Sequence, residues 1–361
     1  MDKKLYRVIF TKDLAMPATR SGIMSGYRLL YKDIPYVMTG KFLERLQDAD
    51  PYAAFELAPE KPLTKQSRSL LLFFPGGIGD VIALRPVLQK FREDNPGVLV
   101  AVVSTVADQP LIGDIVSLFD YPITLIMAEQ FDAWVNVAEM DRASVGQELQ
   151  DTFAKFLGLE PPDASPVLEP DATLVTALQG YVKNPDRPRI GIHMDSASHF
   201  RSIPRKLGLK TAFLLAEHGY DCYMLGGPEN MIVLTYNGKP TAPPEGIYDM
   251  TKILGPLEYY IAFLKHVDVL LTCDTGAMHI AGAMSVPTVA IFGMTNGSKR
   301  TSYYPSVQYL QSSRSCSPCE LITVDPPCEH PWCQAIAEFT PVEIVNKIME
   351  VYRENNAAVS V

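Results

Sequence analysis

Residues 71–88 read LLFFPGGIGDVIALRPVL, and this stretch decides the class of fold that we expect. A fully apolar run is followed by a glycine-rich turn that ends at Asp80, and a segment with helical spacing of apolar residues comes next. A buried strand, a glycine turn and a helix in this order are typical of the first βα unit of a doubly wound α/β domain. The stretch therefore predicts a parallel sheet with Asp80 at its carboxyl edge.

The glycine turn fits neither of the two common nucleotide-binding motifs. A dinucleotide fingerprint needs Gly-x-Gly-x-x-Gly and an acidic residue about 20 positions further on. Here the glycines are Gly76, Gly77 and Gly79, and the second strand ends at Ser104 without an acid. The Gly-Lys-Ser/Thr ending of a P-loop is also missing. Two interpretations remain: a turn that lets a ligand approach the backbone and presents Asp80 for chemistry, or a plain turn with Asp80 as a helix cap.

Strand-like and helix-like segments alternate along most of the chain, and a polar, proline-rich stretch divides them. This stretch, NPDRPR at 184–189, is the expected linker between two halves. We predict an N-terminal extension at 1–66, a Rossmann-like domain at 67–183, a second one at 188–340, and a C-terminal helix and tail at 341–361. The fold class is therefore α/β, with two facing doubly wound parallel sheets.

The hydrophobic pattern also predicts individual elements. The first helix is expected to run to about Asn95, with a strand at 98–104 and a helix at 111–119. In the second half we expect strands at 190–194, 221–227, 267–273 and 288–293, and helices at 208–219, 257–266, 277–285 and 341–354. Thr340 is a plausible N-cap of the last helix, with Pro341 at its first position.

Length, charge and hydropathy narrow the class of protein further. The 361 residues are more than one hydrophobic core usually serves, and the formal charge of −9 argues against a general nucleic-acid binder. No apolar run approaches the roughly 18 to 20 residues that span a bilayer, and MDKKLYRVIF lacks the features of a signal peptide. We therefore expect a soluble, cytoplasmic protein.

A second group of polar residues follows another apolar strand, in LLTCDTGAMHIAGAMSVPTVAIFG at 270–293. Asp274 comes directly after the strand, and His279 lies five residues later, near the start of the next helix. A helix N-terminus offers free N–H groups and partial positive charge, which suit a phosphate. The segment favours a phosphate or ribose site, and the alternative is a capping aspartate with a packed histidine.

Four of the six cysteines lie close together in the sequence. They are spaced C-x2-C-x8-C-x4-C at Cys316, Cys319, Cys328 and Cys333. In a reducing compartment such a cluster is typical of a structural zinc or iron site, because four thiolates can close a tetrahedron. The alternative is a set of reduced or partly oxidised thiols that only pack.

Together these motifs resemble glycosyltransferase family 9, the ADP-heptose lipopolysaccharide heptosyltransferases. PGGIGD at 75–80, LGGPEN at 225–230 and DTGAMH with VPTVAIFG inside 274–293 carry the resemblance. It implies a GT-B fold, with an acceptor domain first and a nucleotide-sugar donor domain second. It also implies inverting transfer of a sugar from a nucleotide diphosphate, with no divalent metal or other cofactor in catalysis.

The resemblance assigns roles to residues of this chain. Asp80 matches the family's proposed catalytic base, and the family's K-x-W-P reads Arg201-Ser202-Ile203-Pro204, which keeps the cation. The related autotransporter heptosyltransferases hold iron through cysteines, which adds to the case for metal at the four cysteines. The expected donor-binding residues are Gly76, Gly77, Gly79, His193, Arg201, Gly226, Asp274, Thr275, Gly276, His279 and Thr295.

The predicted function is transfer of a sugar, by resemblance a heptose from ADP-heptose, to a glycan acceptor such as lipopolysaccharide core. One alternative is a protein heptosyltransferase that acts on an autotransporter, favoured by the cysteine cluster and the N-terminal extension. Another is a catalytically inactive nucleotide-binding scaffold. We expect no nucleic-acid partner, and the sequence is compatible with an oligomer and with peripheral association with the inner membrane.

Overall fold

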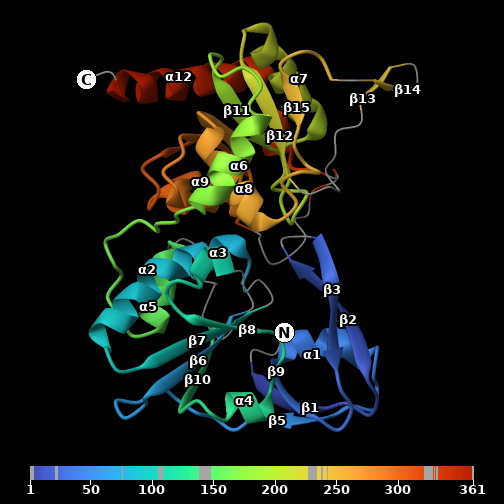
Figure 1. Ribbon diagram of the computed structural model, residues 1–361, viewed down its shortest axis with the longest axis vertical. Helices are drawn as coiled ribbons and strands as arrows, with labels where there is room; N and C mark the ends of the chain where they lie inside the picture. The colour runs from blue at the N-terminus through green and yellow to red at the C-terminus, as the bar shows by residue number, and fades with distance from the viewer. Residues whose placement is uncertain are drawn as a thin grey trace. The chain divides into compact units, whose positions relative to one another are not determined.

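The chain forms two compact units (Figure 1). The computed structural model describes residues 4–20, 23–74, 76–104, 109–137, 148–226, 234–236, 239–241, 243–320, 328, 330 and 332–359. The first unit is Met1–Ser144 with Leu149–Asp163, and the second is Val145–Glu148 with Ala164–Val361. Residues 164–183, which the sequence assigned to the first domain, therefore fall in the second unit.

A four-stranded parallel sheet with the order β10-β6-β7-β8 forms the centre of the first unit. Its strands are β6 (Ser69–Phe74), β7 (Leu99–Ser104), β8 (Ser117–Asp120) and β10 (Ala133–Asn136). Figure 1 shows three helices on one side of it, α2 (Ile78–Asp94), α3 (Gln109–Ile112) and α5 (Leu149–Phe156). Phe74 contacts Phe153 of α5 with a ring-centroid distance of 5.6 Å, which places one core on this face.

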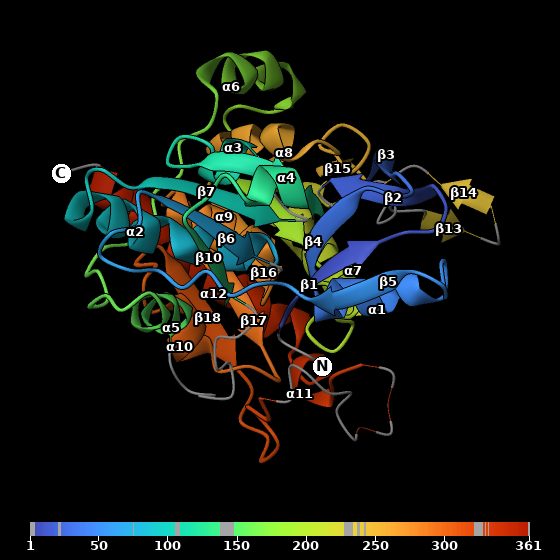
Figure 2. The same cartoon turned by 90° about the horizontal axis from the view of Figure 1, so that it is seen from below.

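The other face of the same sheet is covered by the N-terminal residues. Strands β1 (Leu5–Ile9), β4 (Pro35–Thr39) and β5 (Ala54–Leu57) join β9 (Ile123–Thr124) in an antiparallel sheet of order β5-β1-β4-β9. Figure 2 shows β1 and β5 beside helix α1 (Gly40–Gln47). The hairpin of β2 (Leu14–Arg20) and β3 (Ile23–Leu30) and the short α4 (Leu125–Ala128) complete this layer.

This N-terminal layer shares its core with the parallel sheet. Val8 and Val37 are fully buried in one cluster with Leu71 and Phe73 of β6. Because side chains alternate along a strand, Leu71 and Phe73 face this layer while Phe74 faces α5. The described residues of the N-terminal extension, 4–20 and 23–66, are therefore an integral layer of the first unit.

A six-stranded parallel sheet with the order β15-β12-β11-β16-β17-β18 forms the second unit. Its strands are β11 (Arg189–His193), β12 (Asp221–Leu225), β15 (Ile247–Asp249), β16 (Val269–Cys273), β17 (Thr288–Phe292) and β18 (Val307–Gln311). Numbered along the chain, this order is 3-2-1-4-5-6, that of dinucleotide-binding folds. The strand order reverses between β11 and β16, which makes their carboxyl ends the expected ligand site.

Helices cover both faces of this sheet. They are α6 (Ala172–Leu178), η2 (Gln179–Tyr181), α7 (Arg205–Glu217), α8 (Leu257–Phe263), η4 (Leu264–His266), α9 (Gly276–Ala283), α10 (Gly297–Thr301), α11 (Gln334–Ala337) and α12 (Pro341–Val359), with a hairpin of β13 (Leu234–Tyr236) and β14 (Lys239–Thr241). Thr340 and Glu343 close a reciprocal cap at the start of α12, as expected. In the part of the chain that the structure describes, no helix combines the length and hydropathy needed to cross a membrane.

The predicted doubly wound α/β class is confirmed. Three strands that the sequence analysis missed share one cause. The predicted helix at 111–119 is wrong, because α3 ends at Ile112 and β8 begins at Ser117. Strands β8, β15 and β18 are edge strands that are partly exposed, so they lack the continuous apolar run that marks a central strand. The turn before β8 is set instead by a distant side chain, since Arg85 Nη1 and Nη2 each donate to one carboxylate oxygen of Asp114 at 2.8 Å.

We expect Asp114→Asn to destabilise the first unit in a pH-dependent way. The hydrogen bonds from Arg85 hold the pKa of Asp114 below its usual value, so their stabilisation is complete above the unfolded pKa of about 4 and is lost as the pH falls through the lower folded pKa. Urea unfolding should show a loss of about 1 kcal/mol or less at pH 7, because the Asp114 side chain is 61% exposed to solvent, and this loss should shrink as the pH falls below about 4. Asp163→Asn, at an exposed site, is the matched control and should change little; an equal loss there would contradict the assignment.

Candidate active site

The carboxyl ends of β11 and β16 in the second unit bring several predicted residues together. The Ser196 hydroxyl, in the loop after β11, donates to the backbone carbonyl of Asp274 after β16 at 3.1 Å. Arg201 Nη1 lies 3.3 Å from the same carbonyl oxygen. The two loops therefore meet where the strand order reverses, which is where open α/β sheets bind ligands.

The Asp274 side chain is the anchor of this group. It is only 4% exposed, and its Oδ2 accepts a 2.8 Å hydrogen bond from the Thr295 hydroxyl and lies 3.5 Å from Arg201 Nη1. Burial alone would raise the pKa of Asp274, but the charges of Arg300 and Arg201 outweigh burial and hold the pKa below its usual value. Asp274 is thus an ionised carboxylate that holds Thr295 and Arg201 in place.

Helix α9 begins beside this anchor. Thr275 is its N-cap residue and makes no side-chain capping bond, and Gly276 is the first helical residue. His279 is buried one turn later, with its Nδ1 3.0 Å from the hydroxyl of Tyr304. The first N–H groups of a helix have no partner within the helix and carry partial positive charge, so this end of α9 suits a phosphate group.

Asp80, in the first unit, caps helix α2. Its Oδ2 accepts a 2.8 Å hydrogen bond from the backbone N–H of Gly77, the N-cap residue. The structure therefore confirms that Asp80 caps the helix after the glycine turn. Asp80 is half-buried, and this bond orients its carboxylate at the carboxyl edge of the sheet.

The glycines of this turn differ in what they require. A Cβ atom at Gly76 would lie 2.5 Å from the Phe74 ring and 2.8 Å from the Asp80 Cβ, so only glycine fits there. Gly77 has extended backbone with φ −86° and ψ −178°, which any residue adopts. Gly76, Gly77 and Gly79 belong to the first unit, whereas the other expected donor residues belong to the second.

Comparison with known proteins places the chain in a family. The sequence model of glycosyltransferase family 9 (heptosyltransferase) matches residues 127–325, more than half of the chain. The chain belongs to glycosyltransferase family 9. No curated protein matches this sequence closely.

Solved structures similar to this family 9 glycosyltransferase have the same fold. The ADP-heptose lipopolysaccharide heptosyltransferase II of E. coli has a TM-score of 0.60 at 13% identity, covering 80% of this chain and 99% of its own. A family 9 glycosyltransferase of Veillonella parvula has 0.56 at 16% identity, covering 82% and 99%. The iron-containing dodecameric glycosyltransferase TibC of enterotoxigenic E. coli has 0.58 at 15% identity, covering 98% and 92%. The predicted GT-B fold is confirmed.

His193 of this family 9 glycosyltransferase has protein partners at both ring nitrogens. Its Nε2 lies 3.1 Å from the Asp195 carbonyl oxygen and its Nδ1 3.2 Å from the Tyr260 hydroxyl. A carbonyl oxygen only accepts, so Nε2 carries the hydrogen and the Tyr260 hydroxyl donates to Nδ1. Burial lowers the pKa of His193 to about 4, so the ring is neutral at physiological pH. Because both ring nitrogens are bonded to protein groups, His193 is better placed to position the loop before Ser196 than to contact a ligand.

Gly226 follows β12 at the same edge of the sheet. Its φ of +132° lies in the region that side chains disfavour, so a glycine is needed there. The rest of the LGGPEN motif, residues 227–230, lies outside the described residues. The structure thus explains why glycine is needed at position 226, and donor binding by Gly226 stays a prediction.

The four clustered cysteines do not form a recognisable metal site. Cys333 is buried and Cys319 packs against the same core, whereas Cys316 and Cys328 are exposed. Burial, and then the nearby thiols of Cys319 and Cys328, raise the pKa of Cys333. Over the described ranges, no three His, Cys, Asp or Glu side chains are arranged to hold a metal ion. The structure does not support the predicted zinc or iron.

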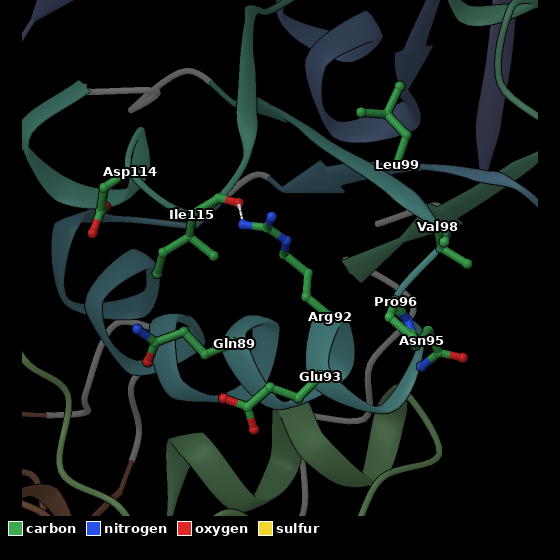
Figure 3. Close-up of a pocket in the computed structure, with 10 residues that line it drawn as sticks. Gln89, Arg92, Glu93, Asn95, Pro96, Val98, Leu99, Asp114 and Ile115 are labelled. Carbon is green, nitrogen blue, oxygen red and sulfur yellow. Dashed lines mark hydrogen bonds between the residues drawn. The ribbon is translucent and has the colours of Figure 1, made fainter.

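A cavity of about 640 Å³ in the first unit lies away from these motifs (Figure 3). Its lining includes Gln89 and Arg92 of α2 and Leu99 at the start of β7, and Figure 3 shows Arg92 donating to the Ile115 carbonyl. It is roughly 20 Å along α2 from Asp80. Open α/β sheets bind ligands at the opposite, carboxyl edge, so this hollow is not the expected substrate site.

We expect His193 to make stability depend on pH. Its pKa is about 4 in the folded chain and about 6.5 in an unfolded one, so the unfolded chain takes up the proton first as the pH falls from 7 towards 4, and stability declines. Urea unfolding at pH 7 and 4.5 should show that this decline is smaller for His193→Gln, by on the order of 1–3 kcal/mol. His218→Gln, at an exposed histidine, should decline as wild type does. Equal pH dependence in all three proteins would refute the neutral ring.

Proposed function

We propose that this family 9 glycosyltransferase moves a heptose from ADP-heptose to a glycan acceptor such as lipopolysaccharide core, with inversion at the anomeric carbon. The main support is the group around Asp274, where two loops, a cation and a helix N-terminus meet at the reversal of the strand order. The donor is suggested by relatives: TibC was also solved with ADP-D-β-D-heptose, and heptosyltransferase II is named for ADP-heptose.

The second unit is proposed to bind the donor. Arg201 would neutralise charge on the diphosphate, and the N–H groups of Thr275, Gly276 and the first turn of α9 would donate to its oxygens. Such groups stabilise negative charge that grows on the leaving diphosphate, and this is where electrostatic catalysis acts most strongly. Asp274, Thr295 and His279 would hold these groups in position, since each is buried and bonded to protein.

The first unit is proposed to supply the base. The acceptor hydroxyl would lose its proton to Asp80 as its oxygen bonds to the anomeric carbon and the nucleotide diphosphate departs with the electrons of the broken bond. No step in this scheme requires a metal ion. We also propose a cytoplasmic location, as expected for an enzyme that takes a nucleotide sugar as donor.

A protein acceptor is a second candidate, and the N-terminal layer favours it. Strand β3 and the loop after it expose Tyr27, Leu29 and Tyr31 at alternate positions, and edge strand β5 exposes Phe55 and Leu57. Apolar side chains beside an unpaired strand edge suit an extended polypeptide. Incubation with ADP-heptose and either lipopolysaccharide core or an unmodified autotransporter distinguishes the two, and turnover of neither would favour an inactive scaffold.

Asp80→Asn is expected to abolish transfer and leave donor binding intact. The asparagine oxygen can still accept from Gly77 N–H, so the cap survives while the proton acceptor is lost. General bases contribute about 10²- to 10⁴-fold, so kcat should fall by at least about 100-fold with an unchanged Kd for ADP.

The matched control for this variant is Glu343→Gln. Glu343 occupies the same capping position in α12, where its carboxylate accepts from Thr340 N–H at 2.7 Å, so it should keep wild-type turnover. Wild-type turnover in Asp80→Asn would make Asp80 a cap only. Loss of ADP binding in that variant would indicate that Asp80 helps to bind the donor, and would contradict its proposed role as the base.

Chelation of divalent cations should leave transfer unchanged. In the proposed scheme, an arginine side chain and backbone N–H groups stabilise the leaving diphosphate in place of a metal ion. Turnover in EDTA should therefore match turnover in Mg²⁺ within about twofold. Elemental analysis of the same sample measures whether the cysteines retain zinc or iron. A rate that vanishes in EDTA and returns with Mg²⁺ would contradict metal-independent catalysis.

A further inference from the structure

Helix α10 places a second arginine near the candidate donor site. Asn296 caps this helix by accepting from Ser298 N–H, and the start of the helix is fixed by neighbouring side chains. Gly297 N–H donates to Gln311 Oε1 at 2.8 Å, and Asn296 N–H donates to Glu320 Oε1 at 3.0 Å. Thr295, directly before the cap, is bonded to Asp274. The helix that carries Arg300 is therefore held against the Asp274 anchor.

Two positive charges act on this anchor. Arg201 lies 3.5 Å from the Asp274 carboxylate, and the positive charge of Arg300 acts on the same carboxylate, helping to hold the pKa of Asp274 low. Arg300 is half-buried and makes no side-chain hydrogen bond or ion pair with any residue that the structure describes. Arg201 is therefore within ion-pair distance of Asp274, whereas Arg300 acts on this carboxylate from further away and keeps its donors available.

We infer that Arg300 is a second donor-binding cation, which contacts the diphosphate of the nucleotide sugar together with Arg201. This inference rests on the proposed function. A half-buried guanidinium group with unused donors suits a phosphate oxygen pair, which arginine binds in a bidentate manner. The neighbouring Lys299 lies on the same helix and carries the same charge, which makes it a suitable comparison.

A purely structural role for Arg300 makes a different prediction. If Arg300 only balanced the charge of Asp274, its loss would disturb the loop that holds Thr295 and would weaken all nucleoside ligands equally. If it binds the diphosphate, its loss would weaken ligands in proportion to their phosphates. The ratio of ADP affinity to adenosine affinity therefore separates the two roles.

The test is calorimetric titration of the full-length chain with ADP, AMP and adenosine. Arg300→Ala should weaken ADP binding by about 10- to 100-fold, because a hydrogen bond to a charged group is lost, and adenosine binding by less than about threefold. Arg300→Lys should recover part of the ADP affinity because it keeps the charge but loses the bidentate geometry. Lys299→Ala is the matched control and should bind all three ligands as wild type does.

Each other result has a defined meaning. Wild-type ADP affinity in Arg300→Ala overturns the inference and leaves the proposed function standing. An equal loss of ADP and adenosine affinity, with a lower Tm, assigns Arg300 a structural role and also overturns it. Failure of the wild-type chain to bind ADP overturns the proposed function itself.

Discussion

The buried carboxylate of Asp274 is the constraint on which the candidate donor site depends. A charge that is 4% exposed is costly unless it is paired and hydrogen-bonded, and Asp274 obtains both from residues far away in the sequence. Thr295 reaches it from the loop after β17, and Arg201 from the segment before α7. Satisfying one carboxylate thus fixes three loops relative to one another at the carboxyl edge of the sheet.

This constraint determines which groups are left for a ligand. The Asp274 carboxylate is turned inward and bonded to protein groups, so the groups offered to a ligand include Arg201 and the first N–H groups of α9. All of them favour negative charge. Preorganised donors of this kind need little rearrangement when a leaving group gains charge, which is how a rigid edge of a sheet can contribute to glycosyl transfer.

The two units follow the same physical rule with different chemistry. In each, the motif lies after the strand next to the reversal of strand order: Asp80 follows β6 beside β10, and Asp274 follows β16 beside β11. In the first unit, a hydrogen bond from the nearby Gly77 N–H orients the Asp80 carboxylate. The Phe74 ring leaves room only for glycine at position 76. In the second unit the carboxylate is oriented by long-range bonds. A local cap tolerates Asp or Asn equally, whereas a buried ion pair does not.

The amino-acid sequence by itself determined the doubly wound class, the central strands, the family and most candidate residues, because these depend on local patterns. Runs such as LLLFF and VLLTC mark strands buried on both faces, and PGGIGD and DTGAMH mark the turns after them. Only the tertiary structure decided that residues 1–66 form a layer over β6, that 164–183 belong to the second unit, and that β8, β15 and β18 are strands at all. It also decided the partners of Asp274 and His193 and the position of Arg300. The reason is the same in each case: edge pairing, layer packing and the pairing of buried charges join residues that are distant in the chain, and no local pattern of residues records which distant partner will be met.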